Sequence, residues 1–173
     1  MHTCRLIYVG WQGYKLGEYS VRQPNYKFDW FIPEQIIGLT HFHAAVTEED
    51  IMGVMQKGQE LTENLVREFH VLIDNRVINM PGLMSLAQMK QMVPYVNHPQ
   101  LKWIVVIKPE SLVTDTDSLP IEEDGSQSLK NVASLPEALE FLMTERPEIG
   151  WEQAASDFFP NSEIEDFLRR KKK

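Results

Sequence analysis

The chain has 173 residues, of which 43% are hydrophobic, so it can bury a core without disulfide or metal staples. Its formal charge is −8, but five of its 17 Lys and Arg residues form the run 169–173. The remainder carries 12 basic and 25 acidic residues, a charge of −13, which argues against general binding to nucleic-acid backbones. Cys4 is the only cysteine, which excludes an internal disulfide.

No stretch reaches the length of a membrane span, and residues 1–10 lack the long apolar core and cleavage site of a secretory signal. We therefore expect a soluble, cytoplasmic protein. We divide the chain into an N-terminal extension (1–23), an α/β domain (24–146) and a C-terminal extension (147–173) with a short helix and a solvated basic tail. Within the first extension, residues 5–9 have the composition of a strand.

Residues 26–31 alternate aromatic with charged side chains, which predicts a strand, and Pro33-Glu34 supplies a turn. Residues 35–45 then form a second, antiparallel strand. Thr47 is the predicted N-cap of a helix, with Asp50 at the reciprocal position. The helix presents one apolar stripe: Ile51, Val54, Met55, Gly58, Leu61 and Leu65. Because glycine lies within this stripe, we expect a strand to pass close beneath it.

Residues 68–109 predict a strand, a crossover helix and a second, parallel strand. The first strand ends at Asp74, and the second, 101–107, is almost wholly apolar, as is typical of strands buried on both faces. The helix occupies residues 83–96, with Pro94 kinking it or ending it early.

Residues 108–125 read as an acidic, solvated loop, followed by a strand at 128–133. Ser134 begins a helix that ends at Arg146-Pro147. Aromatic residues between 148 and 159 should dock on the domain before a terminal helix at 163–170. The predicted fold class is α/β, with a mixed sheet of antiparallel N-terminal strands and parallel central strands, and with helices packed on it.

His41 and His43 alternate on the second predicted strand, so both imidazoles point to one face. Two imidazoles can begin a metal site, but zinc needs a third and usually a fourth ligand, and no other residue has a diagnostic spacing to them. These histidines are weak candidates for a metal site. The alternative is an ordinary strand in which both histidine side chains are hydrogen-bonded. We predict no metal and no cofactor.

Asp74 ends a central strand, at the edge where open α/β sheets bind ligands. Beyond it, Pro81 fits the first turn of the crossover helix, with Asn79 or Met80 at its cap, where free amides attract anions or partner carbonyls. The candidate partner- or anion-binding residues are Asp74, Asn79, Met80, Pro81, Gly82, Ser85 and, at the start of the other helix, Thr47. The alternative is an ordinary strand-to-helix turn. Phosphate-loop, dinucleotide, nucleophile-elbow and zinc-helix motifs are absent, so we predict no enzyme.

The order of these elements, with the segments AVTEE (45–49), HVLID (70–74), LKWIVVI (101–107) and SLPEALEFL (134–142), resembles the STAS-like superfamily. More narrowly, it is similar to bacterial single-domain STAS-like proteins related to anti-sigma-factor antagonists. The resemblance covers residues 24–146. It implies a mixed sheet covered by helices, and a regulatory protein that binds protein partners rather than a catalyst.

In the antagonist branch, a turn of the form Asp-Ser-Ser/Thr-Gly-Leu is phosphorylated to release the partner. The corresponding segment here is Asn79-Met80-Pro81-Gly82-Leu83, which keeps Gly-Leu but has neither hydroxyl nor acid. The resemblance therefore implies a module without the usual phosphorylatable serine. We expect no phosphorylation within residues 79–83.

The architecture is also similar to lipid carriers of the CRAL-TRIO type. Seven methionines are candidates to line an adaptable apolar pocket: Met52, Met55, Met80, Met84, Met89, Met92 and Met143. The predicted function is a non-enzymatic regulatory or protein-interaction module. We expect it to bind a protein partner, for which a second copy of the chain is one candidate, and to bind no nucleic acid. The alternative is a carrier or sensor of a small apolar ligand such as a lipid. A third, less favoured hypothesis is an uncharacterised enzyme that uses Asp74.

Overall fold

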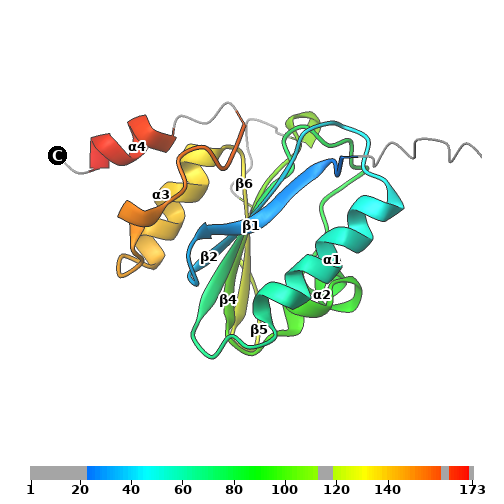
Figure 1. Ribbon diagram of the computed structural model, residues 1–173, viewed down its shortest axis with the longest axis horizontal. Helices are drawn as coiled ribbons and strands as arrows, with labels where there is room; N and C mark the ends of the chain where they lie inside the picture. Colours follow the sequence, from blue (N-terminus) through cyan, green and yellow to red (C-terminus); the bar gives the residue numbers. More distant parts are fainter. Residues whose placement is uncertain (1–22, 113–118, 161–163, 172–173) are drawn as a thin grey trace, which may run out of the picture.

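A six-stranded mixed sheet lies between two helical layers in the computed structural model, which describes residues 23–112, 119–160 and 164–171 (Figure 1). The strand order is β1-β2-β3-β4-β6-β5. The strands are β1 (Tyr26–Ile32), β2 (Ile36–His41), β3 (Phe69–Asp74), β4 (Leu101–Ile107), β5 (Glu122–Asp124) and β6 (Gln127–Val132). The helices are α1 (Glu48–Thr62), α2 (Leu86–Met92), α3 (Leu135–Glu145) and α4 (Ile164–Lys171), with 3₁₀ turns η1 (Pro94–Asn97), η2 (Glu110–Leu112) and η3 (Trp151–Gln153). The predicted α/β class is confirmed; the strand expected at 5–9 lies outside the described residues.

The direction of the chain across the sheet decides where the helices lie. β2, β3 and β4 are successive parallel neighbours, so the crossovers through α1 and α2 advance in the same direction. Because such crossovers are right-handed, both helices must cover the same face. Figure 1 shows α1 and α2 together on one side of the sheet, with α3 and α4 on the other.

The antiparallel pair at the N-terminal edge follows the prediction, but β2 is shorter than expected. β1 and β2 are joined by a turn in which Glu34 has a φ of 56°. β2 ends at His41 rather than near residue 45. The side-chain amide of Asn25 explains this, because it donates to the carbonyls of His43 (3.0 Å) and Ala45 (2.7 Å) and holds that segment as a loop.

Helix α1 begins as predicted. The Thr47 side chain accepts from the Asp50 amide, and the buried Asp50 carboxylate accepts in turn from the Thr47 amide (3.0 Å) and the Asn25 amide (2.9 Å). Two details of the predicted stripe are wrong. Ile51 is 46% exposed, because the stripe turns toward the sheet only from Val54 onward. A Cβ on Gly58 would lie 2.2 Å from the ring of Tyr95, so an aromatic ring from η1, and not a strand, passes beneath this glycine.

The crossover helix begins later than its sequence pattern suggested. Ser85 is the N-cap of α2 and forms a reciprocal capping box with Gln88, so the segment around Pro81 is a loop and not the first helical turn. A serine followed three residues later by glutamine satisfies two helix amides, which Met80-Pro81 cannot do. At the other end α2 stops at Met92, as expected, because Pro94 lacks the N–H that would continue the helix; Pro94 is instead the first residue of η1.

The segment predicted as a loop before β6 contains a short strand. β5 pairs antiparallel with β6 through a turn in which Gly125 has a φ of 66°, a left-handed conformation that favours glycine. Lys90 of α2 forms a 2.8 Å ion pair with Asp124, which ties this acidic edge strand to the helical layer. Ser134 then caps α3, as predicted.

The C-terminal extension shares the hydrophobic core of the domain. Phe158 and Phe159 are each 2% exposed, and Phe159 lies edge-on to Phe31 of β1 with ring centroids 5.3 Å apart. Phe158 covers Gly38 of β2, where an added Cβ would lie 2.5 Å from the ring. The amide of Ala155 also donates to the Phe31 carbonyl (3.0 Å). The expected docking of residues 148–159 is therefore confirmed, and the boundary at 146 divides a single core.

We expect Gly38→Ala to destabilise the fold by about 1–3 kcal/mol, because the new methyl group overlaps the Phe158 ring. In a Phe158→Ala background the same substitution should be neutral or stabilise by up to about 1 kcal/mol, since alanine restricts the unfolded strand more than glycine does. Urea denaturation of the wild type, the two single variants and the double variant measures both effects. A cost that is the same in both backgrounds would contradict the close packing described here.

His70 of β3 is a titratable side chain buried inside the protein. It is 2% exposed, and its Nδ1 atom has no hydrogen-bond partner among the described residues. Burial, reinforced by the charge of Arg146, lowers the pKa of His70 to about 4. The folded protein therefore keeps this imidazole neutral at pH values where the unfolded chain protonates it.

We expect stability to fall as pH decreases from about 6.5 to 4, because only the unfolded state binds a proton at His70 in this window. The folded-state pKa lies below the unfolded one, so this stability is complete above pH 6.5, and about 3 kcal/mol is lost by pH 4. Urea denaturation across this range should show a shallower slope for His70→Leu than for the wild type. Parallel pH profiles of the two proteins would rule out His70 as the source.

Candidate functional site

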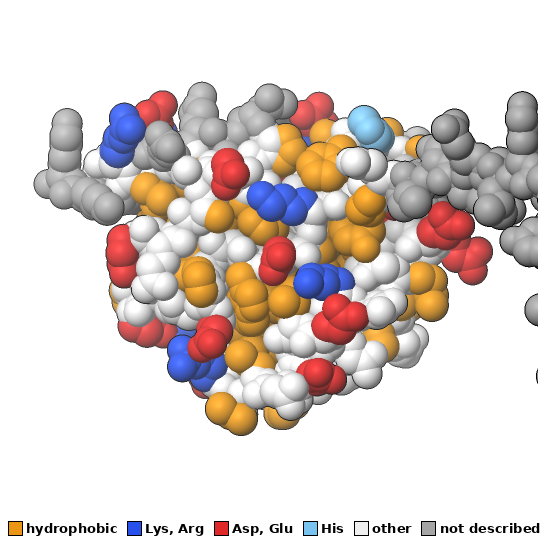
Figure 2. All heavy atoms as spheres, in the orientation of Figure 1, with side chains coloured by type: hydrophobic (Ala, Val, Ile, Leu, Met, Phe, Trp, Pro, Cys, Tyr) orange, Lys and Arg blue, Asp and Glu red, His pale blue; other side chains and the backbone are white. Residues whose placement is uncertain are grey.

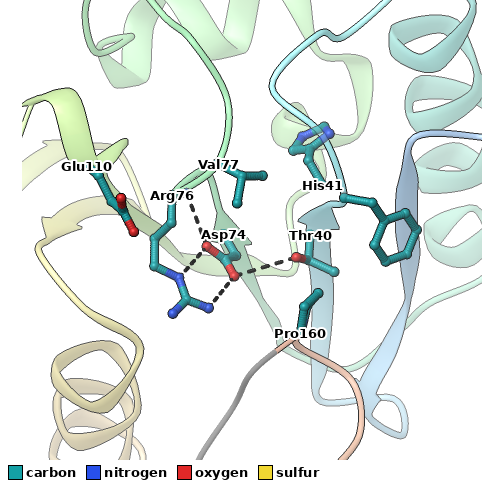
Figure 3. A pocket seen from close by; sticks show the side chains of 8 residues that line it. Thr40, His41, Asp74, Arg76, Val77, Glu110 and Pro160 are labelled. Carbon is teal, nitrogen blue, oxygen red and sulfur yellow. Dashed lines mark hydrogen bonds and ion pairs between the residues drawn. The ribbon is translucent and has the colours of Figure 1, made fainter.

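The carboxyl ends of β2, β3 and β4 meet at one edge of the sheet, at the top of Figure 1. The loops that follow β2 and β3 lie side by side there, since the amide of Asn79 donates to the carbonyl of Ala44 (3.4 Å). A pocket of about 190 Å³ opens at this edge. Its lining combines polar and apolar side chains (Figure 3): Thr40, His41, Phe42, Asp74, Arg76, Val77, Glu110 and Pro160.

Asp74, the candidate predicted at this edge, is held by an internal ion pair. The Arg76 guanidinium donates from Nε to Oδ1 (2.9 Å) and from Nη2 to Oδ2 (2.7 Å), while the Arg76 amide donates to Oδ1 (3.2 Å). The Thr40 hydroxyl lies 3.5 Å from Oδ2. Asp74 is 4% exposed, so this bidentate pairing compensates a carboxylate that is almost fully removed from water.

The turn after β3 explains how two residues so close in sequence form a bidentate pair. Asp74 accepts from the amide two residues on, the hydrogen bond of an Asx turn, which brings the Arg76 side chain back over the strand end. The amide of Asn75 donates to the carbonyl of Ile107 (3.1 Å), which fixes the same turn to the end of β4. The hydrogen bond to Asp74 raises the pKa of Arg76, so its guanidinium stays charged.

The two histidines considered as metal ligands do not share a strand face. His41 is the last residue of β2 and is 7% exposed, whereas His43 lies in the following loop and is exposed. Burial lowers the pKa of His41, which favours its neutral form, and its Nδ1 has no partner among the described residues. Within the described ranges, no three His, Cys, Asp or Glu side chains are grouped closely enough to hold a metal ion.

The other predicted site residues lie outside the pocket lining. Thr47 and Ser85 are the N-caps of α1 and α2, and Asn79 and Pro81 are exposed in the loop between β3 and α2. A Cβ on Gly82 would meet nothing within 4 Å, and the Met80 sulfur accepts from the Asn75 side chain (3.8 Å). These two residues belong to the same loop.

An acid of this chain already occupies the anion position predicted at the start of α2. The Glu122 carboxylate of β5 accepts from the first helical amide, that of Leu86, at 2.9 Å. A carboxylate at this place neutralises the partial positive charge of the helix end. The predicted attraction for anions is thus satisfied from within the fold.

Most of the pocket was not identified from the sequence. Of its eight lining residues, only Asp74 and His41 were singled out. An Asp-x-Arg sequence at the end of a buried strand is a usable signal for the ion pair, because a buried carboxylate needs a cation. Phe42, Glu110 and Pro160 come from three separate segments, and only the folded chain brings them together.

The methionines proposed to line a lipid cavity are distributed over different parts of the fold. Met84 and Met89 pack on the α1/α2 face of the sheet, whereas Met143 packs on the α3/α4 face. Met52 and Met92 are 60% and 56% exposed. They do not surround a common cavity.

Comparisons with protein-family models, with curated proteins and with solved structures found no significant match for this chain. In the described part of the chain, no helix combines the length and the hydrophobicity of a membrane span. The fold and the pocket together define a mixed α/β protein that has a buried carboxylate, paired with an arginine, at the edge of its sheet.

We expect Arg76→Ala to destabilise the protein by about 2–4 kcal/mol, because it leaves a buried carboxylate without its cation. Arg67→Ala is the matched control: Arg67 pairs with Glu34, both side chains are more than half exposed, and its loss should cost less than about 1 kcal/mol. Adding Asp74→Asn to Arg76→Ala should recover part of the loss. Chemical denaturation measures all four proteins, and equal costs for the two arginines would contradict the buried pair.

Proposed function

We propose that this protein is a non-enzymatic interaction module that binds a protein partner through the carboxyl edge of its sheet. One observation carries the proposal. Phe42 and Val77 are 45% and 47% exposed and flank a pocket whose buried carboxylate is internally paired. Exposed apolar side chains beside a recess are typical of contact surfaces.

The state of Asp74 supports an interaction module over an enzyme. A general base or nucleophile needs a carboxylate that a substrate can reach. Both oxygens of Asp74 instead accept hydrogen bonds from Arg76, and the residue is 4% exposed. An ion pair of this kind stabilises the strand end and fixes the shape of the pocket floor.

The dimensions of the pocket support protein binding over lipid carriage. Pockets for small organic ligands have volumes of roughly 300–1,000 Å³ and are largely apolar. This pocket has about 190 Å³, and Thr40, Asp74, Arg76 and Glu110 contribute to its lining. It has the size of a recess for one side chain.

Surface charge indicates the character of the partner. Outside the basic run at 169–173, the chain carries −13, which favours association with a basic surface. On the face shown in Figure 2, hydrophobic side chains reach the surface between acidic and basic ones. The resemblance to bacterial STAS-like regulators also supports binding to a protein partner. The proposed partner is cytoplasmic, and its release does not use the usual phosphorylatable serine, which this chain lacks.

Site-specific photo-crosslinking tests this function. A photoreactive amino acid at Phe42 or Val77 should give a discrete adduct in cells of the source organism, whereas one at Val66 should not. Val66 is 88% exposed and precedes β3, at the opposite end of the sheet. Excess wild-type protein should compete with the adduct, and the Phe42→Ser/Val77→Ser variant should not.

The mass of the adduct also separates a heterologous partner from a second copy of the chain, which would give twice the protein mass. Equal labelling from Val66, or no adduct from either position at the sheet edge, would contradict the proposed contact surface.

A further inference from the structure

The Arg76 guanidinium has an unused edge. Its Nε and Nη2 atoms donate to Asp74, but no acceptor for Nη1 is found among the described residues. Figure 3 shows this second terminal nitrogen directed away from the Asp74 carboxylate. The Arg76 side chain is 26% exposed and lines the pocket, so a group that enters the pocket can contact this side chain.

Glu110 contributes an acceptor to the same pocket. It follows β4, and its amide donates to the Arg76 carbonyl (3.3 Å), so the two residues are neighbours through their backbones. No ion pair joins their side chains in the described part of the chain, although the Glu110 charge contributes to the raised pKa of Arg76. The pocket therefore contains a donor and an acceptor that are not bonded to each other.

The pocket presents charges of both signs to a guest. Arg76 is positive and Glu110 is negative, and both line the pocket, so an ion of either sign meets a like charge there. An incoming carboxylate would pair with Arg76 but face Glu110, and an incoming ammonium would pair with Glu110 but face Arg76. A carboxamide avoids both repulsions, because its oxygen accepts from Arg76 while its NH₂ group donates to Glu110.

The volume and the walls agree with one side-chain end. About 190 Å³ admits the amide and stem of a single side chain, and not an extended chain. Phe42, Val77 and Pro160 provide apolar walls that suit the methylene groups of such a stem.

We propose that this pocket binds the terminal carboxamide of an Asn or Gln side chain on the partner protein. The assignment deepens the interaction function and rests on it, because the partner supplies the side chain. Arg76 holds the carboxamide oxygen through its open edge, Glu110 accepts from its nitrogen, and the apolar walls contact its stem.

Three probes with the same ethyl stem test the assignment: propionamide, propionate and propylammonium. Each is titrated into the full ¹⁵N-labelled chain and followed by NMR. Propionamide should give saturable shifts at the Arg76 Nε–H and at the Val77 and Glu110 amides. Its dissociation constant should be at least about fivefold lower than those of the two ions, roughly the net contribution of one ordinary hydrogen bond.

Glu110→Ala should weaken propionamide binding about fivefold, because it removes one of the two partners of the amide. Glu145→Ala is the matched control, since Glu145 is an exposed acid at the end of α3, outside the pocket, and should leave the dissociation constant unchanged. Tighter binding of propionate or propylammonium, or no saturable shift with any probe, would overturn the carboxamide assignment.

Failure of this assignment and failure of the interaction function give different results. A cross-linked partner without propionamide preference overturns the carboxamide site and leaves the interaction module intact. Propionamide selectivity without a cross-linked partner supports the carboxamide site and overturns the partner as its source.

Discussion

Burial of the central strands on both faces is the constraint on which the rest of this structure depends. Val71 and Leu72 of β3 and Ile104 and Val105 of β4 are inaccessible to solvent and point alternately to opposite sides. The right-handed crossovers place α1 and α2 on one face only, so the other face needs cover from later in the chain. Helix α3 and the segment carrying Phe158 and Phe159 supply it, and this is why the C-terminal extension belongs to the core.

The same burial determines the chemistry of the sheet edge. A strand that is covered on both faces brings its last residue into a desolvated position, and in β3 that residue is Asp74. The carboxylate therefore needs a cation nearby, and the Asx turn provides Arg76 two residues later. This arrangement uses one edge of the guanidinium and leaves the other for the pocket. The ion pair at the strand end and the proposed recognition at this edge thus share one arginine.

The sequence predicted most of the fold but little of the site, for physical reasons that differ. Apolar runs and alternating patterns identified β1, β3 and β4, and Thr47 and Ser134 identified two helix starts, because these signals are local. The start of α2 was misplaced because Pro81 competed with the capping box at Ser85. β5 was missed because its three residues are acidic and are held by Lys90 and by pairing with β6. Pocket residues such as Glu110 and Pro160 are far apart in sequence and meet only through packing.

The length and charge of the edge strand β5 also affect how copies of this chain associate at high concentration. An open sheet has two edge strands, and each exposes hydrogen-bonding groups that can recruit another chain. Here β5 is short and acidic and is tied to α2, while β1 carries Lys27 and Asp29 and gives its Phe31 carbonyl to Ala155. In the described part of the chain, β5 is only three residues long, and β1 is interrupted by two charged side chains. Pairing of copies through the edges of their sheets is therefore disfavoured.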